Sequence, residues 1–255
     1  MINRLDLKTV LDWVPEGCSV LDLGCGDGAF LLRLCNERHV IGVGVEIDAD
    51  NLVSAVQKGL DVIQEDINDG LNCFPNNRFD VVMLTHALQE LTHPHMALAR
   101  MVQIGKQAIV SFPNFGHWFC RMHLGFTGRM PMSRAMPRNW YDTPNIHFCT
   151  VRDFEALCLE LEIDIIERAT IAGSGQHLLA KIWPNLFATS AVYRICRSGQ
   201  ERFGLYSVWG PTLPTPNNLH ATMNLSFITV LSTPHLSRQK SPQNTVSPEA
   251  PTKPC

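Results

Sequence analysis

Short apolar runs alternate along the first half of the chain with segments in which apolar residues recur every three or four positions. The runs have the length of β-strands and are apolar on both faces, as in a parallel sheet that helices cover from both sides. The predicted strands are Ser19–Leu23, Val40–Glu46, Asp61–Gln64, Phe79–Leu84 and Gln107–Phe112. The predicted helices are Leu5–Val14, Phe30–Glu37, Asn51–Lys58 and His95–Val102. This alternation predicts an α/β fold of the Rossmann-like type.

The pattern changes after Pro113. Residues 114–145 are rich in Gly, Pro, Met, Arg and aromatic residues, and their apolar positions show no clear period. Irregular segments of this length inside a compact domain are usually functional lids or binding loops. We therefore expect residues 113–149 to form a lid or a partner-binding insert.

One helix and two strands are expected to complete the domain. Thr150–Leu161 fits a helix with Thr150 as its N-cap and Asp153 as the partner in a capping box. Ile163–Arg168 and Ala191–Cys196 fit a sixth and a seventh strand, paired as an antiparallel hairpin. Residues 1–197 are thus predicted to form one domain around a mostly parallel, seven-stranded sheet.

The last part of the chain, residues 198–255, differs in composition. It holds half of the chain's sixteen prolines, few charges and many Ser, Thr and Asn residues. Such segments bury too little apolar surface to offset the entropy of ordering. We expect a disordered, low-complexity tail.

Composition narrows the class of protein. A net charge of −3 over 255 residues gives no indication of a nucleic-acid partner. Residues 1–10 carry three charges and no apolar core of a signal peptide, and no apolar run reaches membrane-spanning length. The nine cysteines are scattered without a C-x-x-C pair, which favours reduced thiols in a cytoplasmic protein over disulfides or a zinc site. We expect no metal and no membrane partner.

The strongest local motif begins where the first strand ends. Asp22 and Leu23 lead into three alternating glycines, Gly24, Gly26 and Gly28, and a helix follows at once. Glycines let backbone N–H groups approach a ligand, and a helix N-terminus favours negative charge. The acid before the turn indicates a ligand that also carries a cation or hydroxyls. S-adenosylmethionine (SAM) has a carboxylate, an ammonium and ribose hydroxyls.

Two further acids strengthen this interpretation. Glu46 ends the second predicted strand, where it can accept hydrogen bonds from ribose hydroxyls, and Asp66 follows the third, where it can accept the adenine amino group. Ile47 and the Ile67 N–H are expected against the adenine ring. Alternatively, Glu46 and Asp66 are ordinary acids that cap helices.

The predicted ligand is SAM or S-adenosylhomocysteine, with Asp22 near its ammonium and the amides of residues 24–28 facing its carboxylate. A NAD-dependent enzyme is disfavoured, because the glycine spacing is G-x-G-x-G rather than G-x-G-x-x-G and because of Asp66.

A methyl acceptor is not identified by any motif. His86 follows the fourth predicted strand and is either a general base or a hydrogen-bonded wall histidine. Tyr141 and His147 are further candidates for orienting an acceptor. The chain has no Asn-Pro-Pro-Tyr or H-E-x-x-H signature, and no Pro-Cys nucleophile is expected, since its one Pro-Cys pair is Pro254-Cys255 in the predicted tail.

Residues 91–141 contain no Asp or Glu. Their six Lys and Arg residues are interleaved with Trp and Met; they are Arg100, Lys106, Arg121, Arg129, Arg134 and Arg138. This segment fits an acidic partner surface, an anionic cofactor such as coenzyme A, or a solvated loop. Mixtures of Arg, Met and Trp are typical of interfaces, which favours contact with another protein.

Several blocks resemble the bacterial methionine biosynthesis family MetW. They are Leu21–Gly28, Val62–Asp66, Leu88-Gln89, Ile109–Trp118, Gly128–Pro131 and Trp140–His147. The resemblance runs from the N-terminus to about Arg197. It implies a class I SAM-dependent methyltransferase fold. It also implies a role as a partner of the homoserine O-acyltransferase MetX in forming O-acetyl- or O-succinylhomoserine.

Two functions therefore stay open. The first is a SAM-binding subunit that supports or regulates MetX and reports the level of SAM, the end product of the pathway. The second is a genuine methyltransferase acting on a small acid or an acyl thioester.

Overall fold

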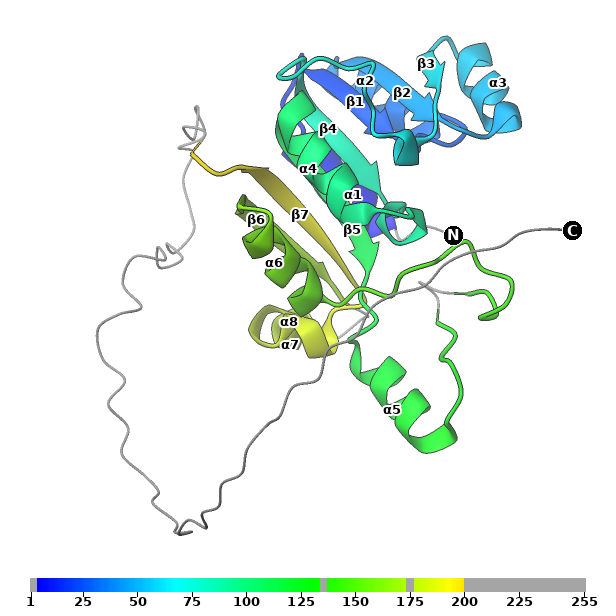
Figure 1. Cartoon of the computed structure of the whole chain (residues 1–255), viewed down its shortest axis with the longest axis vertical. Coiled ribbons are helices and arrows are strands. Elements are labelled where there is room, and N and C mark those ends of the chain that lie inside the picture. The colour runs from blue at the N-terminus through cyan, green and yellow to red at the C-terminus, as the bar shows by residue number, and fades with distance from the viewer. Residues whose placement is uncertain (1–3, 134–136, 173–176, 200–255) are drawn as a thin grey trace, which may run out of the picture. The chain divides into compact units, whose positions relative to one another are not determined.

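A computed structural model describes residues 4–133, 137–172 and 177–199. They form a seven-stranded sheet in the order β3-β2-β1-β4-β5-β7-β6 (Figure 1). The strands are β1 Ser19–Leu23, β2 Ile41–Glu46, β3 Asp61–Gln64, β4 Phe79–Thr85, β5 Gly105–Pro113, β6 Ile163–Ile171 and β7 Ser190–Arg197. The first five are parallel, and β7 runs antiparallel to both of its neighbours. The predicted fold class is confirmed.

Helices and short 3-10 turns connect the strands. They are α1 Arg4–Trp13, α2 Ala29–Arg38, α3 Ala49–Gln57, η1 Ile67–Asp69, η2 Leu88–Glu90, α4 Pro94–Ile104, α5 Trp118–Thr127, α6 Val151–Glu160, α7 His177–Ile182 and α8 Pro184–Phe187. The strand register places Asp22 between Gly44 of β2 and Met83 of β4. The residues that follow β1, β2 and β4 therefore meet at one edge of the sheet, its carboxyl edge.

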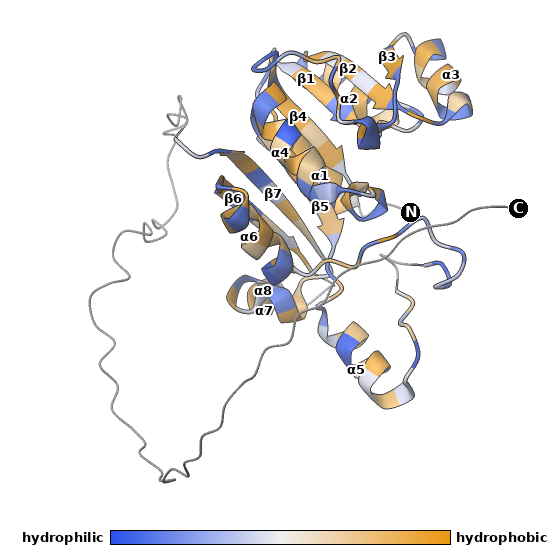
Figure 2. Ribbon diagram, viewed as in Figure 1, coloured by the Kyte–Doolittle hydropathy of each residue, from blue (hydrophilic) through white to orange (hydrophobic). Residues whose placement is uncertain are grey.

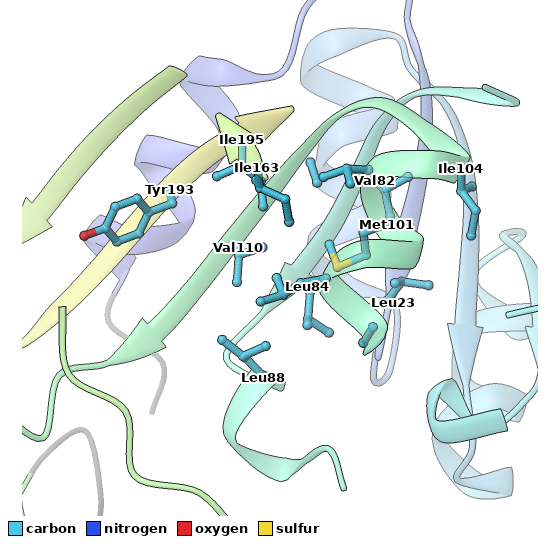
Figure 3. Close-up of a cluster of buried hydrophobic side chains, with 14 of the residues drawn as sticks. Leu23, Val82, Leu84, Leu88, Met101, Ile104, Val110, Ile163, Tyr193 and Ile195 are labelled. Atoms are coloured by element: carbon cyan, nitrogen blue, oxygen red, sulfur yellow. The ribbon is translucent and has the colours of Figure 1, made fainter. Parts of the chain in front are cut away.

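The core lies on both faces of the sheet, as the doubly apolar strands predict. One cluster joins alternate strand residues such as Leu23 and Leu84 to Met101 of α4 and to Tyr193 (Figure 3). The other joins Val20, Met83 and Ile109 to residues of α1 and α2. Hydropathy colouring shows the strands largely apolar along their length (Figure 2). Packed apolar side chains therefore support the strands that form the carboxyl edge on both faces of the sheet.

The closing segment follows its predicted signals. Asp153 N donates to Thr150 Oγ1 at 3.2 Å, and Thr150 N donates to Asp153 Oδ2 at 3.1 Å, so the capping box at α6 is confirmed. β6 continues three residues past its predicted end at Arg168. α7 and α8 were not predicted. The expected disordered tail begins at residue 198, and its residues after Gly199 lie outside the described part of the chain.

The expectation of an irregular segment at residues 114–145 is partly wrong, because α5 occupies residues 118–127. His117 caps this helix by accepting from Phe119 N at 3.3 Å, and Gly128 ends it in the left-handed conformation at φ 63°. The helix was not predicted because Cys120 and Leu124 lie opposite Trp118, Met122 and Phe126, so its apolar positions do not follow one simple period.

No helix in the described residues is both long and apolar enough to cross a membrane.

Candidate functional site

The turn formed by residues 24–28, the glycine turn, lies at the carboxyl edge after β1. Gly28 has φ 73°, and a Cβ there would lie 2.5 Å from Leu60 Cδ1 and 2.9 Å from Ala55 Cβ. Gly26 also has a left-handed φ of 57°, yet a Cβ there would meet no atom within 4 Å. Gly28 is therefore required for packing, whereas Gly26 borders open space.

The amides of the glycine turn are already bonded within the chain. Gly24 N and Cys25 N donate to Val45 O at 2.8 and 3.0 Å, and Gly28 N donates to Cys25 O at 3.0 Å. Gly26 N donates to Glu46 Oε2 at 2.7 Å. A ligand carboxylate can therefore reach these four amides only by displacing an existing bond, and their role in ligand binding stays a prediction.

Glu46 closes the end of β2 against the glycine turn. Its side chain is buried, and its carboxylate accepts from three backbone amides: Gly26 N, Ile47 N at 3.0 Å and Asp48 N at 2.9 Å. A carboxylate has about four lone-pair sites, so these bonds leave roughly one. The side chain of the next residue, Ile47, is 59% exposed.

Asp22 is the buried acid of the site. It is 1% exposed, and its Oδ1 has no hydrogen-bond partner among the described residues. Burial, followed by the nearby charge of Glu46 as the smaller cause, raises the pKa of Asp22 to about 7. A buried carboxylate oxygen without a donor is costly. It is the feature of this edge that a cationic ligand group would satisfy.

Asp66 behaves as the alternative interpretation expected. It is the N-cap of η1, and its Oδ1 accepts from Asn68 N at 2.8 Å and from Asn68 Nδ2 at 2.9 Å. Its Oδ2 takes no part in these bonds. Ile67 is half-buried and reaches toward the glycine turn, since its Cδ1 lies 3.9 Å from a Cβ built at Gly24. The structure thus brings both residues to the same edge as Asp22.

His86 is held in a strained position directly after β4. Its φ is 56°, which is uncommon for a residue other than glycine. Its N–H lies 3.0 Å from Ser111 O and 3.2 Å from Ser111 Oγ. Its Nε2 lies 2.8 Å from Oδ2 of Asp6, which also accepts from Ser190 Oγ at 3.0 Å. Such overdetermined strain is concentrated at functional sites.

Sequence reasoning missed Asp6 and Ser190 as partners of His86. The available signal was the position of Asp6 on α1, where it lies on the same helical face as Val10 and Val14. Both valines are fully or almost fully buried, and Asp6 is 0% exposed. An acid on the buried face of an amphipathic helix requires a partner.

The other two acceptor-side candidates lie on the segment that returns to the sheet. Ile146 N and His147 N donate to Gln89 O at 2.8 and 3.0 Å, which ties this segment to η2. His147 Nε2 lies 3.3 Å from Thr92 O. Tyr141 is 71% exposed, with its ring edge-on to Trp140. The structure brings the backbone of His147, but not the ring of Tyr141, into a hydrogen-bonded position beside η2.

Within the described residues, neither a metal-binding cluster nor the cavity opposite the carboxyl edge offers a better site than that edge. No group of three His, Cys, Asp or Glu side chains in the described residues could hold a metal ion. A cavity of about 260 Å³ lies at the opposite edge of the sheet, lined by residues that include Asn76, Gln103 and Arg197. Its described lining has no carboxylate, so the acids at the carboxyl edge mark the better candidate.

The chain is similar to known proteins over most of its length. Residues 4–195 match the family model described as methionine biosynthesis protein MetW. The chain belongs to the MetW family. It is 34% identical over 207 residues to the bifunctional methionine biosynthesis protein MetXA/MetW of Rhodopirellula baltica, covering 77% of this chain. The match covers only 33% of that longer relative.

Solved structures support the fold. A SAM-dependent methyltransferase of Thermotoga maritima, titled a possible histamine N-methyltransferase, matches with a TM-score of 0.54 at 16% identity, covering 76% of this MetW chain and 87% of its own. Magnesium protoporphyrin IX methyltransferase of Synechocystis, solved with S-adenosylhomocysteine, matches with a TM-score of 0.54 at 15% identity, covering 76% and 83%. The MetW chain therefore has the fold of SAM-dependent methyltransferases.

The MetW-like block around Asn114 has a structural role. Asn114 is buried, its Nδ2 donates to Ala188 O at 2.8 Å, and its Oδ1 accepts from Gly116 N at 3.0 Å and Val151 N at 3.3 Å. One amide side chain thereby links the end of β5 to the start of α6 and the end of α8. The same block contains Ser111, which holds the backbone of His86.

Proposed function

We propose that this MetW chain binds SAM or S-adenosylhomocysteine at the carboxyl edge of its sheet. The observation that carries the proposal is the unpartnered, buried Oδ1 of Asp22 at the end of β1, which the glycine turn with its open space at Gly26 follows directly. In this proposal Asp22 receives the ligand's ammonium. Glu46 accepts from the ribose, Ile47 covers the adenine ring, and Asp66 Oδ2 and Ile67 N–H meet the polar edge of the adenine.

Glu46 must change partners for this ligand. With three lone-pair sites used by amides, it has about one left for two ribose hydroxyls. We infer that binding opens the bond between Gly26 N and Glu46 Oε2. The released Gly26 amide is then free to meet the carboxylate of the ligand, the contact expected of the glycine turn.

We further propose that the chain regulates a homoserine O-acyltransferase of the MetX type. The Rhodopirellula relative is named as a bifunctional MetXA/MetW protein, which supports an association of the two functions. SAM is the end product of the pathway. A subunit with different SAM affinity in two states of the complex would therefore pass the SAM level to the acyltransferase.

The test uses the full chain co-purified with the acyltransferase of the same organism. Calorimetry with SAM and with S-adenosylhomocysteine measures binding, and acyltransferase activity is followed across a SAM titration. We expect saturable binding and a change in activity over the same concentration range. Binding without any change in activity would refute regulation, and absence of binding would refute the cofactor site.

A second candidate function is methyl transfer, favoured by the strained His86 and its buried partner Asp6. Bound SAM supplies an activated methyl group, and the chain's part is to orient an acceptor and take up its proton. His86 fits the proton acceptor, and Tyr141 and His147 fit orienting groups. The acceptor would be a small acid or an acyl thioester. Formation of S-adenosylhomocysteine on incubation with cell metabolites would support this function, and its absence would count against it.

A further inference from the structure

Helix α5 exposes an unusual amount of apolar surface. Figure 1 shows it projecting away from the sheet, and Figure 2 shows apolar positions along it. Five of its ten residues are large, exposed apolar side chains: Trp118, Phe119, Met122, Leu124 and Phe126. Phe126 is 80% exposed. Only Cys120 of the ten is buried.

Four of these five apolar residues form an ordered stripe. At about 100° per residue, Trp118, Met122, Phe126 and Phe119 fall within roughly 100° of the helix circumference. Cys120, the buried residue, lies on the opposite side. The stripe therefore faces away from the domain and has the spacing of a helix that inserts into a groove of a partner.

The helix gains little stability from its own domain. An isolated helix of fewer than about 12 residues is marginal in water, and α5 has ten. Burying a large apolar side chain is strongly favourable. Covering the stripe would therefore stabilise α5 far more than its propensity does.

The segment that returns to the sheet extends this apolar surface. Trp140, Tyr141, Ile146 and Phe148 are all exposed, with Trp140 at 72%. Phe148 packs against Phe115, just before α5, with ring centroids 4.9 Å apart. The helix and the returning segment thus start from a common base. We call α5 together with residues 128–133 and 137–148 the arm surface.

The charge of the arm surface is positive. Arg121, Arg129 and Arg138 are exposed on it, and its described residues before Asp142 include no acid. The other described cations of the acid-free segment lie elsewhere, since Lys106 pairs with Asp80 and Arg100 donates to Phe74 O. The arm surface therefore fits a partner with an apolar groove and acidic residues at its rim.

We propose that the arm surface is where the acyltransferase subunit docks, with α5 seated in an acid-rimmed apolar groove of that enzyme. This inference rests on the proposed association with a MetX-type enzyme and names the surface through which the two proteins would bind. A second copy of this chain fits less well, because each arm surface would bring three exposed arginines against only one described acid, Asp142. None of the carboxyl-edge acids belongs to the arm surface, so loss of the stripe on α5 should leave SAM binding intact.

The test compares two substitutions of equal exposure. Phe126→Asp places a charge in the stripe, and Leu159→Asp places one at an 81% exposed position of α6 as the matched control. Titration of each full-length variant with the purified acyltransferase measures Kd. We expect Phe126→Asp to weaken binding at least tenfold and Leu159→Asp to leave it unchanged. SAM binding should be unchanged in both.

Each contrary result has a distinct meaning. If the unsubstituted chain forms no complex with the acyltransferase, the proposed function fails. If it does and Phe126→Asp binds equally well, the docking surface is wrong and the association stands. The unsubstituted chain could instead associate with itself or sediment with anionic phospholipid vesicles. If Phe126→Asp abolishes either behaviour, the stripe has another occupant and the inference is overturned.

Discussion

His86 Nε2 lies 2.8 Å from Asp6 Oδ2, so the residue after β4 is fixed to the first helix of the chain. Asp6 is completely buried, and the His86 side chain is 19% exposed. The pair joins positions eighty residues apart and is supported by Ser190 at the start of β7. It holds the wall of the carboxyl edge in place at the point where the backbone of His86 is strained.

Loss of Asp6 should destabilise the fold. Asp6→Ala leaves Ser190 and His86 without their buried acceptor, which costs about 1–3 kcal/mol of the free energy of unfolding. The measurement is denaturant unfolding followed by circular dichroism. Asp12→Ala on the same helix is the control, because Asp12 is exposed and makes only a surface pair with Arg38 at 3.5 Å, worth at most about 1 kcal/mol. Equal effects of the two substitutions would show that the buried pair has no special role.

Asp22 should make stability depend on pH. Burial, with Glu46 as the second cause, raises its pKa in the folded state to about 7 from 3.8. Between these values the folded state holds more protons than the unfolded state, so the contribution of Asp22 to stability is lost as pH rises toward 7. Unfolding measured from pH 4.5 to pH 8 should show this loss in the unsubstituted chain. Asp22→Asn should remove it, and parallel pH profiles for the two proteins would disprove the assignment.

The same group should make ligand affinity depend on pH in the opposite sense. An ammonium binds the ionised carboxylate, so SAM affinity should fall as pH drops below about 7, the pKa of Asp22. Near pH 7, binding should release part of a proton, which calorimetry in buffers of different ionisation enthalpy detects. The Asp22→Asn variant should bind weakly and show neither effect. Strong, pH-independent binding by the unsubstituted chain would place the ammonium elsewhere.

Gly26→Val should block the ligand with little damage to the fold. The added side chain points into open space, and the left-handed backbone costs about 1–2 kcal/mol. Gly59→Val is the matched control, because Gly59 has φ 82° and no atom within 4 Å of its Cβ position, yet it follows α3 rather than β1. Both variants should unfold at similar denaturant concentrations, but only Gly59→Val should retain SAM binding in calorimetry. If both bind SAM, the ligand does not approach Gly26.

Glu46 and Asp66 show which features of the site can be predicted from the local sequence pattern. Their positions at strand ends were predictable, since the carboxyl ends of parallel strands share an edge. The bond of Asp66 as the N-cap of η1 fits the alternative that the sequence left open. The bond of Glu46 with Gly26 N was not predictable, because it joins residues twenty positions apart.

The sequence by itself determined the strands, most helices and the glycine turn, because apolar periodicity and capping residues act over a few neighbouring positions. Only the tertiary structure decided which distant groups meet. It paired Asp6 with His86, set β7 between β5 and β6, and left the stripe of α5 uncovered. These contacts depend on how whole elements pack, and such packing leaves no mark in the period of a single segment.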